Sequence, residues 1–215
     1  MKTILLIGLG RFGKHIAMKL ADMNHQVLAV DSNEERVDEV MDIVTRAQIG
    51  DSTDRAFLAS LGVRSFDVCI VAIGDDFQNS LETVWLLREL GARKVIARAS
   101  QDLQEKFLLS NGADEVVYPE KQMASWTAIR CASEHILEYA ELDHNVAIFE
   151  LEVPVQWDGK TLLQLDIRRR FGINVLGIRE KGGLNMNVRP EMQLSSNQSI
   201  LVAGNEKEVH RCFRI

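Results

Sequence analysis

The first thirteen residues constrain the fold of this chain more than any other stretch. A short apolar run, Thr3–Ile7, leads directly into the sequence GLGRFG at residues 8–13, and an amphipathic helical pattern begins at Lys14. The order of buried strand, G-x-G-x-x-G and helix is the context in which this short motif indicates a phosphate-binding turn. The sequence therefore predicts a nucleotide site at the junction of the first strand and the first helix.

Each glycine of the motif has a separate physical role. Gly8 permits the tight turn, Gly10 lets the backbone approach a pyrophosphate, and Gly13 allows the helix to pack closely on the strand. Asp31 ends a second apolar strand, 27–30, at the distance where such sites place an acid on a ribose diol. This acid would repel a 2′-phosphate, so we expect a nucleotide that lacks one as the ligand.

Strands and helices alternate along the first 118 residues. The expected strands are 3–7, 27–31, 46–49, 67–73, 94–98 and 115–118. This alternation is typical of a Rossmann-type α/β fold with a doubly wound parallel sheet, in which ligands bind beyond the carboxyl ends of the strands. The expected ligand-binding residues at that edge are Gly8, Gly10, Arg11, Phe12, Gly13, Asp31, Ser32, Asp51, Ser52, Ala72, Ile73, Gly74 and Arg98.

The pattern changes at Pro119, where a long helix is expected to run to about Leu142. Trp126 and Tyr139 lie on one face of that helix, which favours a subunit contact over packing on its own domain. We expect three parts: a nucleotide-binding domain at 1–118, a crossover and dimerisation helix at 119–142, and a small α+β domain at 143–215. The last is short for a catalytic substrate domain.

Charge and cysteine content exclude several classes of function. The net charge is −6, with 10 Lys+Arg and 9 Asp+Glu in residues 143–215 against 15 and 22 in the remainder, so neither part has the basic face of a nucleic-acid or membrane-surface binder. The three cysteines lack C-x-x-C spacing and fit reduced thiols, two of them buried. No membrane-spanning run or signal peptide is visible, and a cytoplasmic location is expected.

Two other classes of function compete with a regulatory role. An NAD-dependent dehydrogenase needs an acid–base residue near the nicotinamide, yet none of the histidines falls in a strand-end loop, and His15, which opens the first helix, is expected at the surface. We therefore expect no enzyme activity. A nucleotide sensor that serves some other partner is the second alternative.

The chain resembles the cytosolic regulatory subunits of bacterial Ktr/Trk-type potassium transporters, which consist of an N-terminal and a C-terminal RCK (KTN) domain. The resemblance spans the whole chain. It is carried by IGLGRFG at 7–13, LAVD at 28–31, VAIG at 71–74, GAD at 112–114, YPEKQMA at 118–124, LDIR at 165–168 and FGINV at 171–175. The GRFG form of the glycine motif is more similar to the Ktr branch than to the Trk branch.

The resemblance implies a homo-oligomer built from dimers, an octameric ring that docks beneath a membrane potassium-channel subunit. It implies that ATP or ADP in the N-terminal crevices changes the shape of the ring and gates the pore, with NAD(H) as the alternative ligand. The protein would then lie at the inner face of the cell membrane through its transporter partner.

Individual residues acquire expected roles from the same resemblance. Arg11 is a permanent cation suited to a terminal phosphate, and the matching family residue reaches a phosphate on a neighbouring subunit; the alternative is a solvated loop charge. Arg98 is either a second phosphate contact or part of a surface ion pair. Glu120 matches a family position that holds a cation, Mg²⁺ or Ca²⁺, although an acid at a helix start is expected in any case.

The C-terminal domain of relatives can bind cyclic di-AMP between two copies. The matching positions in this chain are Leu162, Leu163, Asp166, Arg168, Arg170, Asn174, Val175 and Pro190. The alternative is a dimerisation domain in which the apolar members of this set form the core.

Overall fold

The computed structural model describes residues 1–143 and 145–215, and it divides into two compact units, Met1–Lys121 and Gln122–Ile215. His144, which belongs to the stretch expected to begin the second domain, lies outside the described residues. Among the described residues, no helix has both the length and the apolar character needed to cross a bilayer.

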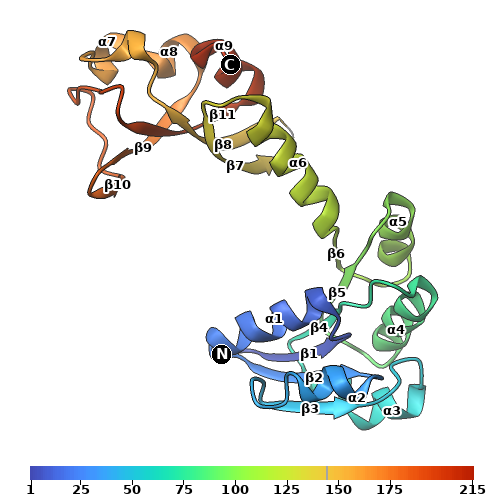
Figure 1. The fold of residues 1–215 in the computed structure, drawn as a ribbon. Helices are drawn as coiled ribbons and strands as arrows, with labels where there is room; N and C mark the ends of the chain where they lie inside the picture. Colours follow the sequence, from blue (N-terminus) through green and yellow to red (C-terminus); the bar gives the residue numbers. More distant parts are fainter. Residues whose placement is uncertain (144) are drawn as a thin grey trace. The chain divides into compact units, whose positions relative to one another are not determined.

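The first unit is built on a six-stranded sheet with the strand order β3-β2-β1-β4-β5-β6. Every pairing in the sheet is parallel, which confirms the predicted Rossmann arrangement (Figure 1). The strands are β1 (Thr3–Ile7), β2 (Gln26–Asp31), β3 (Arg46–Ile49), β4 (Val68–Val71), β5 (Val95–Arg98) and β6 (Glu115–Val117).

Both faces of this sheet are covered, because successive residues of the central strand enter different hydrophobic clusters. Leu5 and Ile7 of β1 pack in one cluster together with Leu87, whereas Leu6 packs in the other together with Ala17. Side chains of a strand alternate between the faces of its sheet. The continuous apolar run in the sequence therefore reflects a strand buried on both sides.

The helices of the first unit are α1 (Arg11–Asp22), α2 (Glu34–Asp38), α3 (Arg55–Ser60), α4 (Phe77–Glu89) and α5 (Asp102–Ser110), with a 3₁₀ turn η1 at Val63–Ser65. Side chains of Asn33, Asp54 and Asp76 cap α2, α3 and α4 by accepting hydrogen bonds from first-turn N–H groups. Helix α1 begins at Arg11 rather than at Lys14 as predicted, so the arginine of the glycine motif is already helical.

Helix α6 (Pro119–Ala132) begins in the first unit and ends in the second. The prediction that it continues to Leu142 is wrong, because residues Ile136–Asp143 form strand β7. Ile136 and Tyr139 are both buried although they are three residues apart, and the register of β7 on its neighbour shifts between Ile136 and Glu138. A bulge of this kind returns the strand to the same face after three residues, which mimics helical spacing in the sequence.

The second unit holds a five-stranded antiparallel sheet with the order β10-β9-β11-β8-β7, as expected for a small α+β domain (Figure 1). Its remaining strands are β8 (Val146–Glu152), β9 (Asn174–Glu180), β10 (Gly183–Asn185) and β11 (Ser199–Asn205). Short helices α7 (Leu162–Leu165) and α8 (Ile167–Phe171), the C-terminal helix α9 (Glu206–Phe213) and a 3₁₀ turn η2 (Val155–Trp157) complete it. Phe149, Leu151, Ile178 and Ile200 lie at the centre of its core.

The three cysteines are free thiols, and two of them are buried as predicted. Burial raises the pKa of Cys69 to about 12 and that of Cys212 to about 11, so both remain protonated at neutral pH. Cys131 on α6 is exposed.

Candidate functional site

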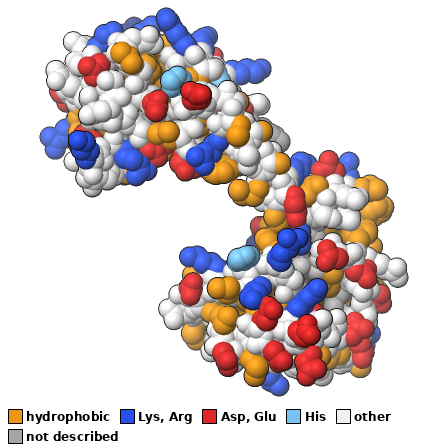
Figure 2. All heavy atoms as spheres, viewed as in Figure 1, with side chains coloured by type: hydrophobic (Ala, Val, Ile, Leu, Met, Phe, Trp, Pro, Cys, Tyr) orange, Lys and Arg blue, Asp and Glu red, His pale blue; other side chains and the backbone are white. Residues whose placement is uncertain are grey.

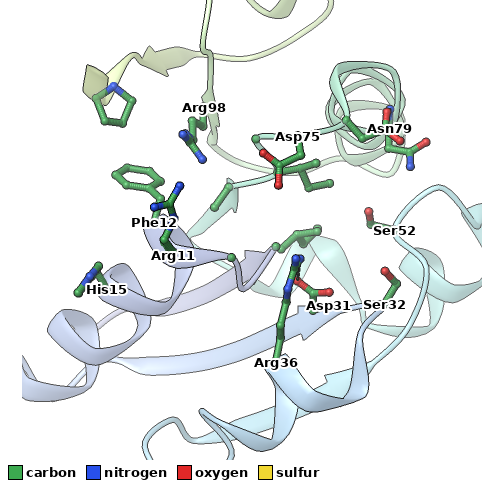
Figure 3. Close-up of a pocket in the computed structure, with 18 of the residues that line it drawn as sticks. Arg11, Phe12, His15, Asp31, Ser32, Arg36, Ser52, Asp75, Asn79 and Arg98 are labelled. Carbon is green, nitrogen blue, oxygen red and sulfur yellow. Dashed lines mark hydrogen bonds and ion pairs between the residues drawn. The ribbon is translucent and has the colours of Figure 1, made fainter. Parts of the chain in front are cut away.

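A cavity of about 700 Å³ lies at the carboxyl ends of the parallel strands in the first unit. The loops after β1, β2, β3 and β4 line it together with the end of β5 and the start of α6 (Figure 3). This is the edge at which open α/β sheets bind ligands. The cavity therefore occupies the place that the sequence predicted for a nucleotide.

The glycine motif forms the floor of the cavity with little spare room. Gly8 has a φ of +92°, and a Cβ there would lie 2.9 Å from the backbone nitrogen of Ile73. A Cβ on Gly13 would lie 1.9 Å from the carbonyl oxygen of Gly8. Gly10 is different, because a Cβ there would meet no atom within 4 Å. Two glycines thus fix the turn, while the third borders open space that a ligand can approach.

Helix α1 starts at this turn and presents its N-terminus to the cavity. Its N-cap is Gly10, which provides no side-chain hydrogen bond to the first-turn N–H groups. The N–H groups at a helix start carry partial positive charge and favour an anion. Because Gly10 and Arg11 both line the cavity, a phosphate there would meet the N–H groups and the side chain of Arg11 together.

Asp31 marks the opposite part of the cavity and is only 7% exposed. Its Oδ2 accepts a hydrogen bond of 2.6 Å from the backbone N–H of Leu9, and its Oδ1 accepts one of 2.9 Å from that of Asn33. Each carboxylate oxygen can accept a further hydrogen bond. The carboxylate is thereby held in place by the backbone and retains acceptor capacity for a ribose diol.

Arg36 on α2 lines the same part of the cavity, and sequence reasoning missed it. Its Nη1 lies 3.7 Å from Oδ2 of Asp31, and Figure 3 shows the side chain rising beside that carboxylate. The sequence feature that could have indicated Arg36 as a lining residue is its position five residues after Asp31, in the helix that follows the second strand. Its guanidinium places a positive charge next to the carboxylate of Asp31.

Arg98 lies at the end of β5, and its side chain lines the cavity next to the glycine motif. Its guanidinium carbon lies 5.4 Å from the centre of the Phe12 ring, which is a cation–π distance (Figure 3). A Cβ on Gly74 would lie 2.3 Å from Nη1 of Arg98, so the absence of a side chain at position 74 makes room for the arginine. The Nε of Arg98 is buried and has no hydrogen-bond partner among the described residues.

Glu120, in the first turn of α6, forms an ion pair with Arg98 Nη2. A hydrogen bond to its own backbone N–H lowers the pKa of Glu120, and Arg98 and Arg11 lower it further. The Arg98 ion pair that the sequence left as an alternative is therefore present. Among the described residues, no group of three or more His, Cys, Asp and Glu side chains is placed to hold a metal ion.

The remaining predicted residues also reach the cavity. Ser32, Asp51, Ser52, Ala72 and Ile73 all line it. Ser52 is buried and shares a 2.8 Å hydrogen bond with the hydroxyl of Thr83. Thr53 donates two hydrogen bonds to Asp51, one from its hydroxyl and one from its backbone N–H. Both lower the pKa of the Asp51 carboxyl, and the bond from the hydroxyl has the larger effect.

Of the predicted site residues in the first unit, Gly13 alone is absent from the lining, because it packs α1 against the turn. The predicted binding residues did not include the lining residues Ile7, His15, Arg36, Gly50, Asp75, Asp76, Asn79 and Pro119, although the sequence placed Gly50 and the stretch after Ile73 at the same crevice. His15 was expected at the surface; it is exposed and also lines the cavity, one helical turn beyond Arg11.

The two ends of the cavity carry different side chains. Figure 3 shows Arg11, Phe12 and Arg98 at one end, and Asp31, Ser32 and Ser52 at the other. Figure 2 shows acidic side chains spread over the visible surface of this unit, with basic ones among them. A ligand with phosphates at one end and a ribose at the other matches this arrangement.

The residues predicted to bind cyclic di-AMP in the second unit fall into two groups, one packed on the core and one largely exposed to solvent. Leu162 and Val175 pack against the hydrophobic core. Leu163 is 67% exposed, and its backbone N–H donates to the carbonyl of Pro190 at 2.8 Å. Arg168 and Asn174 are exposed, Asp166 is half-buried, and the guanidinium of Arg170 lies over the ring of Phe171. Leu162 and Val175 therefore pack on the core, as in the alternative, whereas Leu163, which the alternative also placed in the core, is exposed together with several polar members.

Comparison with known proteins supports the resemblance noted in the sequence. The TrkA-N domain family matches residues 4–119, and the TrkA-C domain family matches residues 146–215. The chain is 37% identical to Ktr system potassium uptake protein C of Bacillus subtilis (strain 168) over 98% of this chain and 95% of that protein. It is 35% identical to Ktr system potassium uptake protein A of the same organism, with the same coverage.

Among solved structures, the fold is similar to that of the GsuK channel, with a TM-score of 0.71 and 23% identity. The similarity covers 97% of this chain and 38% of the channel chain. At this identity the similarity shows the fold alone.

Proposed function

The chain belongs to the family of proteins with a TrkA-N and a TrkA-C domain, in its Ktr branch, and from this premise we propose that it is a nucleotide-sensing regulatory subunit of a potassium transporter. The supporting observation is the cavity in the first unit, in which the glycine turn, a held carboxylate and two arginines lie at one sheet edge. The family relatives are named as potassium uptake proteins.

The proposed ligand is an adenine nucleotide, with ATP and ADP favoured and NAD(H) as the alternative. Asp31 would bind the ribose, while Arg11, the α1 N-terminus and Arg98 would bind phosphates. Two arginines at the phosphate end suit a group with a terminal phosphate, whereas the nicotinamide riboside that follows the pyrophosphate of NAD(H) adds no further anion. Mg²⁺ or Ca²⁺ at Glu120 remains part of the proposal, and it would have to compete with Arg98 for the carboxylate.

The proposed mechanism is a shift between two shapes of a homo-oligomer. A ligand changes such an equilibrium only through its difference in affinity for the two shapes. ATP and ADP differ by one phosphate, so the difference has to arise at the phosphate end of the cavity. We propose that dimers assemble into an octameric ring beneath a membrane potassium-transporter subunit, at the cytoplasmic face of the membrane, and that the chain has no enzyme activity and no nucleic-acid partner.

Cyclic di-AMP is proposed as a second ligand between two copies of the C-terminal unit. Arg168, exposed on α8, is available for a phosphate, and exposed Leu163 for an adenine. Titration of the folded protein with cyclic di-AMP should release or absorb heat; absence of binding would remove this ligand from the proposal.

The decisive experiment is titration calorimetry with ATP, ADP, AMP, NAD⁺ and NADH, each with and without Mg²⁺. An affinity that depends on the number of phosphates supports the proposed sensor. Preference for NAD(H) over ATP would instead indicate a redox sensor. Co-purification with a Ktr-type membrane subunit, and nucleotide-dependent potassium flux through that pair in liposomes, distinguishes a transporter subunit from a sensor that serves another partner.

A further inference from the structure

Arg98 connects the cavity to the helix that enters the second unit. It leaves the end of β5 and points into the cavity over Phe12, as Figure 3 shows. Its ion-pair partner, Glu120, is the second residue of α6. One guanidinium therefore contacts both the proposed phosphate end and the start of α6.

The arrangement of Arg98 leaves hydrogen-bonding capacity unused. The guanidinium carries five N–H donors, yet its Nε is buried without an acceptor in the part of the chain that the structure describes. Nη1 lies against Gly74, where a Cβ would be only 2.3 Å away. Burial of a hydrogen-bond donor without a partner costs free energy. A ligand oxygen that draws Arg98 from this position would therefore relieve that cost and also form a favourable contact with the guanidinium.

Glu120 is well placed to be exchanged for such a ligand. Its side chain is 56% exposed, whereas that of Arg98 is 19% exposed. When the ion pair opens, the carboxylate can therefore be hydrated, while the arginine needs another anion. Arg11 is the other cation that acts on Glu120, and it also lines the phosphate end of the cavity.

We propose that Glu120 and a ligand phosphate compete for the guanidinium of Arg98, so that Glu120 sets the affinity of the cavity for phosphorylated ligands. This inference rests on the proposed nucleotide function. Glu120 is then a positioning residue that acts through Arg98. Binding of a phosphate transfers the guanidinium from carboxylate to ligand and leaves Glu120 without this partner at the start of α6.

The test is calorimetric titration of the full chain with ATP, ADP and adenosine in the presence of EDTA, which removes divalent cations. Glu120→Asp keeps the negative charge but shortens the side chain by one methylene, so it weakens the contact with Arg98. We expect ATP and ADP to bind about threefold to fivefold more tightly to this variant, the factor that an exposed ion pair is worth. Adenosine, which has no phosphate, should bind with unchanged affinity.

Three controls separate competition from simpler effects. Repulsion between Glu120 and the ligand would persist in Glu120→Asp, so it predicts no gain in affinity, whereas Glu120→Gln would gain under either explanation. In an Arg98→Ala background, Glu120→Asp should have no effect on any ligand. Asp102→Asn removes the 2.7 Å ion pair with Lys121, the next residue of α6, and should leave all affinities unchanged.

The outcomes are distinct. If the unaltered protein binds ATP and Glu120→Asp binds it with the same affinity, the competition is refuted and the nucleotide function stands. Weaker binding would also refute it, by showing that Glu120 holds Arg98 in place for the ligand. If the unaltered protein binds none of the nucleotides, the proposed function itself fails. Thermal unfolding of every variant establishes that it is folded.

Discussion

The two units differ in how the hydrogen-bonding capacity of their buried charged side chains is used. In the first unit, the carboxylate of Asp31 receives backbone hydrogen bonds at one end of a cavity, and Arg98 keeps an unpaired Nε at the other. In the second unit, Glu150 is 4% exposed and accepts two hydrogen bonds from Arg179, of 2.6 and 2.9 Å, and another from Ser199. The first arrangement retains bonding capacity, whereas the second consumes it within the sheet.

This difference follows from the two kinds of sheet. A parallel sheet directs all its strand ends, and the loops after them, to one edge, so polar groups collect there around a space. In the antiparallel sheet of the second unit, Glu150 on β8 and Arg179 on β9 flank Ser199 of β11. The charges on the two strands that flank β11 pair with each other across it and leave little for a ligand. The comparison indicates that the first unit keeps polar groups available for a ligand, whereas the second unit uses them for its own stability.

The largest effect is expected from Gly13→Ala. The new Cβ would lie 1.9 Å from the carbonyl oxygen of Gly8, so the turn and α1 must separate, at a cost of about 3 kcal/mol of unfolding free energy. Chemical denaturation followed by circular dichroism measures this change. Gly10→Ala is the matched control, since its Cβ meets no atom within 4 Å, and it should retain stability. Equal losses for both variants would contradict the division of roles among the glycines.

Glu150→Ala should destabilise the second unit by about 2 kcal/mol, because it removes a buried ion pair and its hydrogen bonds. Denaturation monitored for the C-terminal unit measures the loss. Affinity for ATP should not change, because Glu150 lies in the other unit. A large drop in nucleotide affinity with intact folding would break the comparison between the units.

Asp31→Asn should weaken every ligand that carries a ribose about tenfold, which is the effect of losing one charge-assisted hydrogen bond. Titration with ATP, ADP and adenosine measures it. The amide retains one acceptor oxygen for the backbone, so the glycine turn should remain folded. Unchanged affinity for all three ligands would exclude Asp31 from the site.

Arg11→Ala should reduce the preference between ATP and ADP about fivefold, the value of one exposed charge contact. The affinity for adenosine should change little, because Arg11 lies at the phosphate end of the cavity. The same titrations measure both quantities. Equal losses for ATP, ADP and adenosine would make Arg11 a general loop contact.

The smallest effect concerns pH and the second unit. The hydrogen bond from Arg179 is the main cause that lowers the pKa of Glu150 below its usual value of 4.5. A carboxyl whose pKa is lower in the folded protein stabilises it above the unfolded pKa, and this contribution is lost as the pH falls through the folded value. Between about pH 5 and pH 3, the melting temperature of the unaltered protein should therefore fall by a few degrees more than that of Glu150→Gln. Parallel curves would show that Glu150 contributes no such dependence.

Local sequence patterns were sufficient for most of the first unit. A strand buried on both faces requires a continuous apolar run, and a tight phosphate turn requires glycine, so β1 and residues 8–13 are legible without a structure. The expected order of strands and helices, and the place of Asp31 and Arg98 at one edge, follow from the connection rules of parallel sheets.

Patterns failed where a non-local contact decides the conformation. Ile136 and Tyr139 have helical spacing, but both lie in strand β7. A bulge in the pairing of β7 with β8 places both side chains on the buried face of that strand. Arg36 and His15 belong to amphipathic helices in which exposed polar residues are expected. Only the position of α1 and α2 at the strand ends places these two side chains on the cavity.

The sequence by itself determined the Rossmann fold, the glycine turn and the acid at the second strand end, because each depends on residues that are close along the chain. The tertiary structure alone decided what Arg98 contacts. Its side chain contacts Phe12, Gly74 and Glu120, which come from three segments that are far apart in the sequence. Contacts between such segments depend on how the strands and helices pack, and that information is distributed over the whole unit.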